Sequence, residues 1–531
     1  PGAFAPVEVD GQVLVDGGLV RNIGVDVARD LGAERLIVVN VGTPLMKRAE
    51  IGSLVNSADQ MLRILNGQNV EASLATLSPQ DVLIVPDLGA LGSTDFANGH
   101  RWIAAAESAT RRSARELAAY SVPPEEYAAW RAQQRLARAE PVPNRIEIDT
   151  SALRRVPPAA IATAVGPSPN DAEATVGALL VTDDFETVKG KVRSDERGTT
   201  LVLQPVEKPW GPDYLRAGLL LNTDFAGNSH FLVTVDHRAT WLNQGGLEWR
   251  NRASFGQINA LRSQLRLPFD TSRTWFVAAE AVAAERQRDV FQAGIDAARY
   301  QLRSESAALL AGRTLGAAGE FSLGFERGQD SSRLSIGTPV ITPRTVTTGV
   351  FRAGLILDTL DSLDFPTHGT LLRSDLRIAA ATLDSDVAYR RWSSEASAAF
   401  GGHNASLLFT ARYETALHTE LPLSQAFSTG GLFNLSGLSQ EQLLADEIGF
   451  LRGIYRTRFL QGNTLLPDLY AGVSLELADI HRSYDPSAAH QIVAESVFLS
   501  APSVLGPLYL GIGAASGGHG AIYFSLGRPW P

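Results

Sequence analysis

The pattern of hydrophobic and polar positions changes twice along the chain. In the first part, short apolar runs alternate with long amphipathic segments. The runs at residues 35–42 and 81–89 are rich in β-branched side chains, which is typical of strands buried on both faces. Residues 51–77 and 100–136 carry apolar residues at helical spacing. Strands that alternate with helices predict a layered α/β sheet for residues 1–138.

A small domain is predicted after a proline-containing polar stretch at residues 139–144, which is typical of a linker. The pattern of residues 144–208 predicts one strand, two helices and two further strands, in the order β-α-α-β-β. The two last strands alternate between apolar and polar positions. This domain therefore differs from the α/β part before it and from the long β-rich part that follows.

From about Trp210 onward, hydrophobicity alternates every second residue. In LLFTARYETAL, one face carries Leu407, Phe409, Ala411 and Tyr413, and the other carries Thr410, Arg412 and Glu414. A soluble β-sandwich shows the same alternation, so a soluble β-domain stays open beside a membrane barrel. At about ten residues per strand plus turns, residues 210–531 predict about 16 strands, which is the size of an outer-membrane barrel with a polar lumen.

Composition excludes several classes of protein. No apolar run approaches the roughly 18 residues of a membrane-spanning helix, so a helical membrane protein is excluded. The net charge of −10 argues against a nucleic-acid partner, because phosphate binding needs a basic surface. The chain has no cysteine, no histidine pair at metal-binding spacing and no phosphate loop. We therefore expect no disulfide, no metal and no cofactor.

Acyl transfer is the one chemistry for which the chain offers a candidate residue. No serine lies in a Gly-x-Ser-x-Gly elbow, so a hydrolase nucleophile would have to lie upstream of Pro1. His100, the only histidine of the α/β part, stands at the predicted start of a helix. Asp16, in Asp16-Gly17-Gly18, is therefore the remaining candidate for a general base. The alternative is a simple turn residue, because Asp-Gly is a favoured hairpin turn.

Four stretches resemble parts of a patatin-like phospholipase autotransporter of the type V secretion class. In that family a patatin domain is joined to a polypeptide-transport-associated (POTRA) domain and to an outer-membrane barrel of the surface-antigen family. Residues 1–42 and 77–96 resemble the second half of a patatin domain, so we expect an N-terminal truncation. Residues 206–225 resemble the junction between the POTRA domain and the barrel, and residues 357–376 resemble a barrel strand entry.

The resemblance implies three domains. Residues 1–138 would be the C-terminal part of a patatin-like α/β hydrolase domain, and residues 144–208 a POTRA-like domain. Residues 210–531 would form an antiparallel transmembrane β-barrel. The hydrolase domain would lie on the cell surface, be secreted or remain in the periplasm.

The resemblance also implies an activity in lipid degradation. The intact protein would be an outer-membrane-anchored lipid acyl hydrolase, a phospholipase A-type esterase with a Ser-Asp dyad. Asp16 would accept the proton of the upstream serine, and Gly17 and Gly18 would support the turn that presents its carboxylate. The fragment alone would be inactive. The implied partners are a phospholipid or other lipid ester as substrate, outer-membrane lipids and the outer-membrane assembly machinery, and a homo-oligomer is left open.

The chain lacks the glycine-rich oxyanion loop and the Gly-x-Ser-x-Gly serine of the resembled family, and it departs from that family at two further places. The family carries Arg-Gly-Tyr on the loop that folds into the barrel lumen, whereas Ser436-Gly437-Leu438 stands at the apparent equivalent here. The chain ends in Trp530-Pro531 in place of a terminal aromatic residue, so assembly machinery is expected to recognise Trp530. A second interpretation stands beside the hydrolase: a protein-translocating or protein-assembly outer-membrane barrel with a non-catalytic N-terminal domain.

Overall fold

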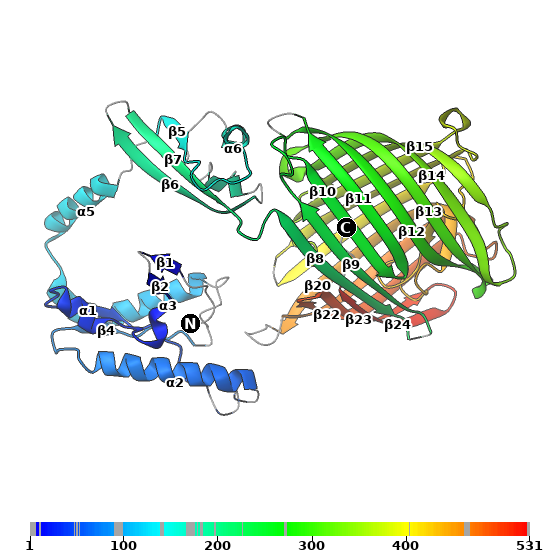
Figure 1. Ribbon diagram of the computed structural model, residues 1–531. Coiled ribbons are helices and arrows are strands. Elements are labelled where there is room, and N and C mark those ends of the chain that lie inside the picture. The colour runs from blue at the N-terminus through cyan, green and yellow to red at the C-terminus, as the bar shows by residue number, and fades with distance from the viewer. Residues whose placement is uncertain are drawn as a thin grey trace. The chain divides into compact units, whose positions relative to one another are not determined.

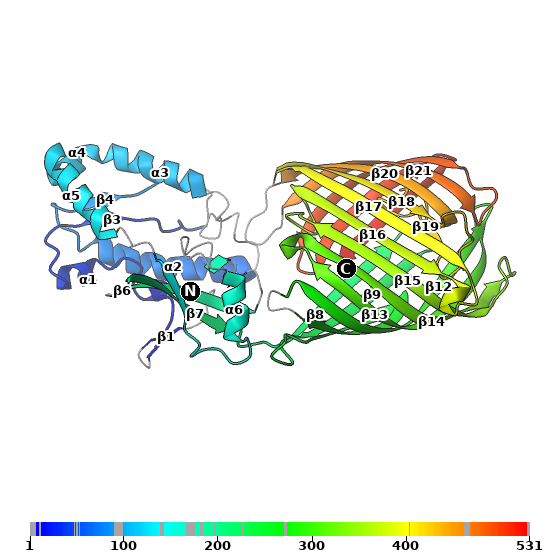
Figure 2. The same cartoon turned by 90° about the horizontal axis from the view of Figure 1, so that it is seen from above.

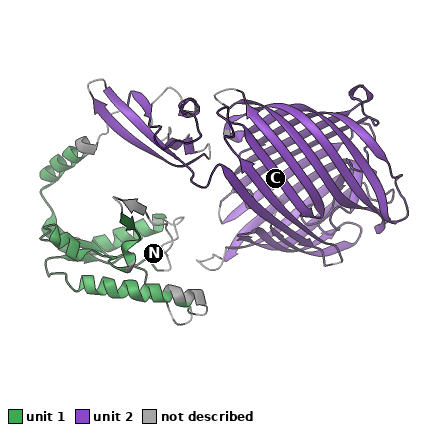
Figure 3. Ribbon diagram, viewed as in Figure 1, with its two compact units in different colours: residues 1–139 green, residues 140–531 purple. Residues whose placement is uncertain are grey.

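The computed structural model describes residues 7–9, 12–46, 48, 51, 54–89, 99–138, 143–165, 176–177, 179–180, 184–195, 198–225, 227–269, 273–402, 404–460 and 468–527. The chain forms two compact units, Pro1–Ala139 and Glu140–Pro531 (Figure 3). Within the described part of the chain, no helix is long and apolar enough to cross a membrane.

The first unit combines short strands with longer helices. Strands β1 (Val7–Val9) and β2 (Gln12–Leu14) pair antiparallel, and β3 (Ile37–Val39) and β4 (Val82–Ile84) pair in parallel. The helices are α1 (Val25–Asp30), α2 (Leu54–Leu74), α3 (Gly99–Arg112), α4 (Ala114–Leu117) and α5 (Pro124–Arg138). Val82, Ile84 and Ala109 form the buried core of this unit. Its assignment to a patatin domain stays a prediction.

The second unit begins with a small three-stranded domain, which we call the small module (residues 144–208). It contains β5 (Arg145–Ile148), α6 (Pro158–Val165), β6 (Phe185–Asp195) and β7 (Gly198–Glu207). The sheet order is β5-β7-β6, with β5 and β7 parallel and β6 and β7 antiparallel. Much of the predicted second helix lies outside the described residues. The assignment as a POTRA-like domain stays a prediction.

Glu207, at the end of β7, stabilises the turn before α6. Its Oε1 accepts hydrogen bonds from the backbone N–H groups of Arg154, Arg155 and Val156 at 3.0, 2.9 and 2.8 Å. We expect Glu207→Ala to destabilise the small module by on the order of 3 kcal/mol, because three amides lose one charged acceptor. Hydrogen exchange of β5 and β7 measures the loss. Glu186→Ala, an exposed control on β6, should leave the exchange unchanged; equal effects would contradict this role.

Sixteen antiparallel strands close into a barrel in the described part of the second unit (Figures 1 and 2). They are β8 (Asp213–Thr223), β9 (Ser229–Ala239), β10 (Glu248–Gly256), β11 (Ile258–Pro268), β12 (Trp275–Gln292), β13 (Ile295–Thr314), β14 (Gly319–Gly337), β15 (Thr345–Asp358), β16 (Gly369–Ala379), β17 (Tyr389–Gly401), β18 (Ala405–Thr415), β20 (Leu443–Leu460), β21 (Leu469–Ser483), β22 (Gln491–Ser503), β23 (Gly506–Ala515) and β24 (His519–Gly527). The predicted antiparallel barrel of about 16 strands is confirmed.

The alternation along these strands places exposed apolar side chains on the outer face, and charged side chains beside a buried apolar cluster on the inner face. Val493, Val497 and Leu499 of β22 are 49%, 57% and 50% exposed. The residues on either side of Val497, Ser496 and Phe498, are buried. Arg266 of β11 bonds Glu320 of β14, across two intervening strands, so both side chains point into the lumen. An apolar outside around a polar lumen is the arrangement of a membrane barrel, whereas a soluble sandwich buries its apolar face.

Candidate functional site

Asp16, the predicted proton acceptor, caps a short turn of the first unit. It precedes the 3-10 turn Gly17–Leu19, and its Oδ1 accepts a hydrogen bond from Gly18 N at 2.9 Å. This bond is the main cause of a lowered pKa of the exposed carboxyl. A general base works best with a pKa near the operating pH, so the shift weakens Asp16 as a base. The catalytic assignment stays a prediction.

The glycines of this motif are not required by the local backbone. Gly17 and Gly18 are absent from the described residues with a positive φ, and a Cβ at Gly17 would meet no atom within 4 Å. The described residues also contain no group of three or more histidine, aspartate or glutamate side chains that could hold a metal ion. We therefore turn to the buried hydrogen bonds inside the barrel.

The barrel encloses a long segment of its own chain, residues 416–442 between β18 and β20, which we call the luminal loop. Strand β19 (Phe427–Thr429) belongs to this loop and pairs with the first residues of β20. Leu435 and Ser436 of the loop are 0% exposed. The luminal loop is therefore part of the folded interior of the barrel.

The tip of the luminal loop binds one carboxylate of the barrel wall. Glu476 of β21 accepts hydrogen bonds from Leu435 N at 2.7 Å, Ser436 N at 2.7 Å and Ser436 Oγ at 2.8 Å. Ser474 Oγ donates a fourth, at 2.5 Å. A buried charge is tolerated when donors surround it, and four do so here. Ser436 and two backbone amides thus bind the wall, at the apparent equivalent of the arginine in the resembled family.

Gly437 lets the tip approach the wall closely. Its N–H donates to the Tyr523 hydroxyl at 2.7 Å, and that hydroxyl donates to Leu438 O at 2.6 Å. The φ of Gly437 is 111°, and a Cβ there would lie 2.5 Å from Ala515 N. Any other residue at this position would be strained and would clash with β23.

Arginines from several strands bind the rest of the luminal loop. Arg288 of β12 is buried and donates to Ala426 O at 2.9 Å and Leu423 O at 3.2 Å. Further bonds to the loop are Arg286 to Ser424 O at 2.8 Å, Arg391 to Gln425 O at 3.0 Å, Arg412 to Asn434 Oδ1 at 2.9 Å and Arg452 to Phe433 O at 2.8 Å. The loop is therefore bonded to wall strands from β12 to β24.

Strands β24 and β8 close the barrel at a seam. Among the described residues, which end at Gly527, four residue pairs join Phe524–Gly527 to Leu220–Thr223, whereas β8 pairs with β9 along all of its 11 residues. On the seam side, Leu215–Leu219 of β8 has no strand partner among the described residues. The unpaired N–H and C=O groups of such an edge can pair with another strand. Trp530, expected to be a recognition residue, lies outside the described residues.

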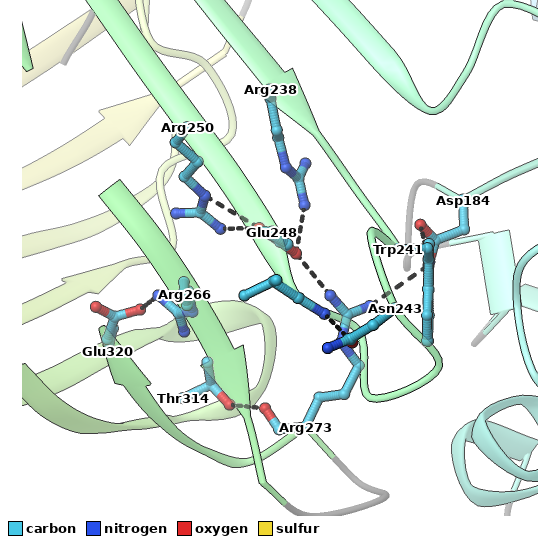
Figure 4. A network of polar contacts seen from close by, with 11 residues as sticks. Asp184, Arg238, Trp241, Asn243, Glu248, Arg250, Arg266, Arg273, Thr314 and Glu320 are labelled. Atoms are coloured by element: carbon cyan, nitrogen blue, oxygen red, sulfur yellow. Dashed lines mark hydrogen bonds and ion pairs between the residues drawn. The ribbon is translucent and has the colours of Figure 1, made fainter. Parts of the chain in front are cut away.

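Asp184 links the small module to the turns of the barrel (Figure 4). Trp241 Nε1 donates to Asp184 Oδ1 at 2.9 Å, and Arg273 Nη1 lies 3.5 Å from Asp184 Oδ2. The Arg273 guanidinium stacks on the Trp241 ring at 4.7 Å and bonds Glu248 of β10 at 2.6 Å. One continuous network therefore joins the module to the strands that follow the seam.

The Asp184 contact predicts a pH dependence. Burial raises the pKa of the Asp184 carboxyl above its ordinary value, so the folded module binds this proton more tightly than the unfolded chain does. The contribution of Asp184 to the stability of the module should therefore be largest at low pH, and should be lost as the pH rises from the ordinary pKa of aspartate through the raised one. Asp184→Asn removes this titration, while its side-chain oxygen still accepts from Trp241. Hydrogen exchange, referenced to the unfolded chain at each pH, measures the stability of the module. As the pH rises, the stability of the wild type should fall relative to that of Asp184→Asn; identical stability profiles of the two proteins would contradict the prediction.

The chain was compared with known proteins. No protein-family model matches it. Among solved structures it is similar to BamA from Haemophilus ducreyi lacking POTRA domains 1–3, with a TM-score of 0.55 and 11% identity over 72% of this chain and 84% of that one. It is also similar to CdiB from Escherichia coli (TM-score 0.49, 13% identity, 73% and 76% covered) and CdiB from Acinetobacter baumannii (0.49, 12%, 93% and 88%).

The expectation of an enzyme is wrong. The finding that overturns it is the likeness in fold to the BamA barrel, which points against a patatin-like phospholipase. A lipid substrate, an autotransporter identity and a surface-displayed hydrolase domain are likewise unsupported. The expected outer-membrane barrel is confirmed. The 16 strands of this chain form an outer-membrane β-barrel similar in fold to that of BamA.

Proposed function

We propose that this chain is a protein-translocating or protein-assembly barrel of the outer membrane, which receives an extended polypeptide segment at the β24–β8 seam. The observation that carries the proposal is the edge Leu215–Leu219 of β8, which we call the seam edge and which pairs with no strand on the seam side among the residues that the structure describes. The proposed partners are outer-membrane proteins or their assembly machinery. The first unit has no catalytic role in this proposal.

The physical reason lies in backbone hydrogen bonding. A barrel in lipid satisfies its backbone N–H and C=O groups by pairing every strand on both sides, and an unsatisfied group there costs several kcal/mol. Among the described residues, the seam edge pairs on one side only, and Leu215 on it is 72% exposed. An added strand would satisfy the edge by main-chain hydrogen bonds, which is how extended peptides bind sheet edges.

The luminal loop supports the proposal because it contacts the turn that begins beyond β8. Ser439 Oγ of the loop donates to Asp224 Oδ2 at 2.9 Å, and Asn228 Nδ2 donates to Ser439 Oγ at 2.9 Å. Asp224 and Asn228 lie in the β8–β9 turn. A movement of the luminal loop would thus act directly on the strand that forms the seam edge.

A disulfide across the seam tests the proposal. The chain has no cysteine, and Leu221 pairs with Leu526 across the seam. The double variant Leu221→Cys/Leu526→Cys should lock the seam on oxidation and lower the amounts of other outer-membrane or surface proteins in cells. A reductant should restore them.

The matched control places the same disulfide between β10 and β11. Ala253 and Leu261 are paired there, in a part of the wall where strands pair on both sides. The oxidised Ala253→Cys/Leu261→Cys variant should behave like the wild type. If the seam-locked variant is folded and oxidised but leaves the outer-membrane proteins unchanged, the proposed function is wrong.

A further inference from the structure

The first four barrel strands carry an excess of arginine on the lumen wall beside the seam. The whole chain has a net charge of −10. In contrast, the inward charged side chains of β8–β11 are Arg216, Arg238, Arg250, Arg252, Arg262 and Arg266, together with Asp236 and Glu248. We call these residues the arginine wall. Its positive sign is opposite to that of the chain as a whole.

Register and ion pairs establish that these side chains share the inner face. Arg216 stands opposite Asp236, and Asp236 stands opposite Arg252 and bonds it at 2.6 Å. Figure 4 shows Arg238 and Arg250 converging on Glu248. Arg266 of β11 forms an ion pair with Glu320 of β14, across two intervening strands of the wall. The two side chains can meet only inside the barrel. Arg262 lies four residues before Arg266 on β11 and therefore faces the same way.

The acidic residues present do not neutralise this wall. Glu248 is shared by three guanidinium groups, those of Arg238 at 3.1 Å, Arg250 at 2.6 Å and Arg273 at 2.6 Å. Arg262 lies 3.9 Å from Glu280, and its side chain is 52% exposed. The side chain of Arg216 forms no hydrogen bond or ion pair among the described residues. Uncompensated positive charge therefore faces the lumen at the seam.

Arg216 lies within the seam edge itself. Its neighbours Leu215 and Ala217 are exposed on the opposite, outer face. A strand added to this edge would alternate in the same way, with apolar side chains outward and one side chain opposite Arg216. Directly opposed residues have Cβ atoms about 5 Å apart, which is the range of a cross-strand ion pair.

We propose that the arginine wall selects extended polypeptide segments that carry acidic side chains at their inward positions, above all at the position opposite Arg216. The inference rests on the function proposed above and names the class of segment that the seam accepts. A polypeptide fits the surface better than an anionic lipid, because the charges face the lumen and the adjoining edge offers backbone hydrogen bonds. Apolar residues at the outward positions complete the pattern.

Two peptides in proteoliposomes of the full chain test the selection. Both alternate valine with a charged residue, which is glutamate in one and lysine in the other, and both carry a photo-cross-linking residue. At low salt the wild type should bind the glutamate peptide roughly tenfold more tightly. The variant Arg216→Glu should reverse the preference, since the lysine peptide then meets the opposite charge.

Arg373→Glu is the matched control. Arg373 on β16 stands four residues before Arg377, which bonds Glu326 of β14, so it shares the inner face. Like Arg216, its side chain forms no ion pair among the described residues, and it lies far from the seam in strand order. This variant should keep the preference for glutamate. Heat-dependent gel migration establishes that each variant is a folded barrel.

The outcomes separate the two proposals. If neither peptide cross-links to β8 of the wild type, the proposed function fails. If both cross-link with equal yield, or if Arg216→Glu still prefers glutamate, the charge selection is overturned while strand addition stands. Reversal in Arg216→Glu together with an unchanged preference in Arg373→Glu supports the inference.

Discussion

Replacing Glu476 with alanine is expected to release the tip of the luminal loop from the barrel wall. The substitution removes the acceptor of four hydrogen bonds, three of them from Leu435 and Ser436 of the loop. The loss of this acceptor leaves the donors without a charged partner. We expect it to destabilise the docked loop by on the order of 4 kcal/mol. A released loop no longer fills its part of the lumen. The conductance of single barrels in planar bilayers should therefore rise.

The control for this prediction is Glu495→Ala. Glu495 lies on the neighbouring strand β22 and is exposed on the outer face, so its loss should leave the conductance unchanged. Protease cleavage within residues 416–442 gives an independent measure of release. Unchanged conductance and cleavage in a folded Glu476→Ala barrel would show that this carboxylate does not hold the loop.

Replacing Gly527 with valine is expected to break the seam. Gly527 pairs with Leu220, its φ is 85°, and a Cβ there would lie 1.8 Å from Leu219 O. The clash is with backbone, which cannot rotate away as a side chain can. Because the described part of the seam has four pairs, we expect a loss of several kcal/mol and a fall in the temperature at which the barrel unfolds on gels.

Gly294→Val separates the clash from backbone strain. Gly294, in the β12–β13 turn, also has a positive φ, of 75°, but a Cβ there would meet no atom within 4 Å. This variant should therefore cost only about 1 kcal/mol, from strain alone. If both variants lower the unfolding temperature equally, close packing at the seam is not what requires glycine at position 527.

The barrel was predictable because two-residue alternation and strand length are local properties of the sequence. The contact at the tip of the luminal loop could be predicted only in part. Ser436-Gly437-Leu438 stood out as a departure from a resembled family, but its partner Glu476 lies 40 residues further on. Strand register alone brings them together, and one acidic residue at an inward position carries no local signal of that role.

The seam and the arginine wall could not be seen in the sequence at all. The seam joins strands from the two ends of the barrel, Thr223 with Phe524, and the extent of that pairing has no local signal in the sequence. The hydrolase interpretation is contradicted by the likeness in fold to the BamA barrel. It rested on a short motif, Asp16-Gly17-Gly18, whose catalytic role stays a prediction and which caps a turn in the structure.

Site-specific photo-cross-linking at Ala217, on the seam edge, is the most direct test of the central claim. The photo-reactive residue is placed at Ala217 in one protein and at Leu261, within the fully paired wall, in another. The proposed function predicts adducts with other polypeptides in cells at Ala217 alone. These adducts should vanish when the Leu221→Cys/Leu526→Cys disulfide locks the seam and return on reduction. Adducts of equal yield at both positions, or adducts that survive the locked seam, would contradict the claim.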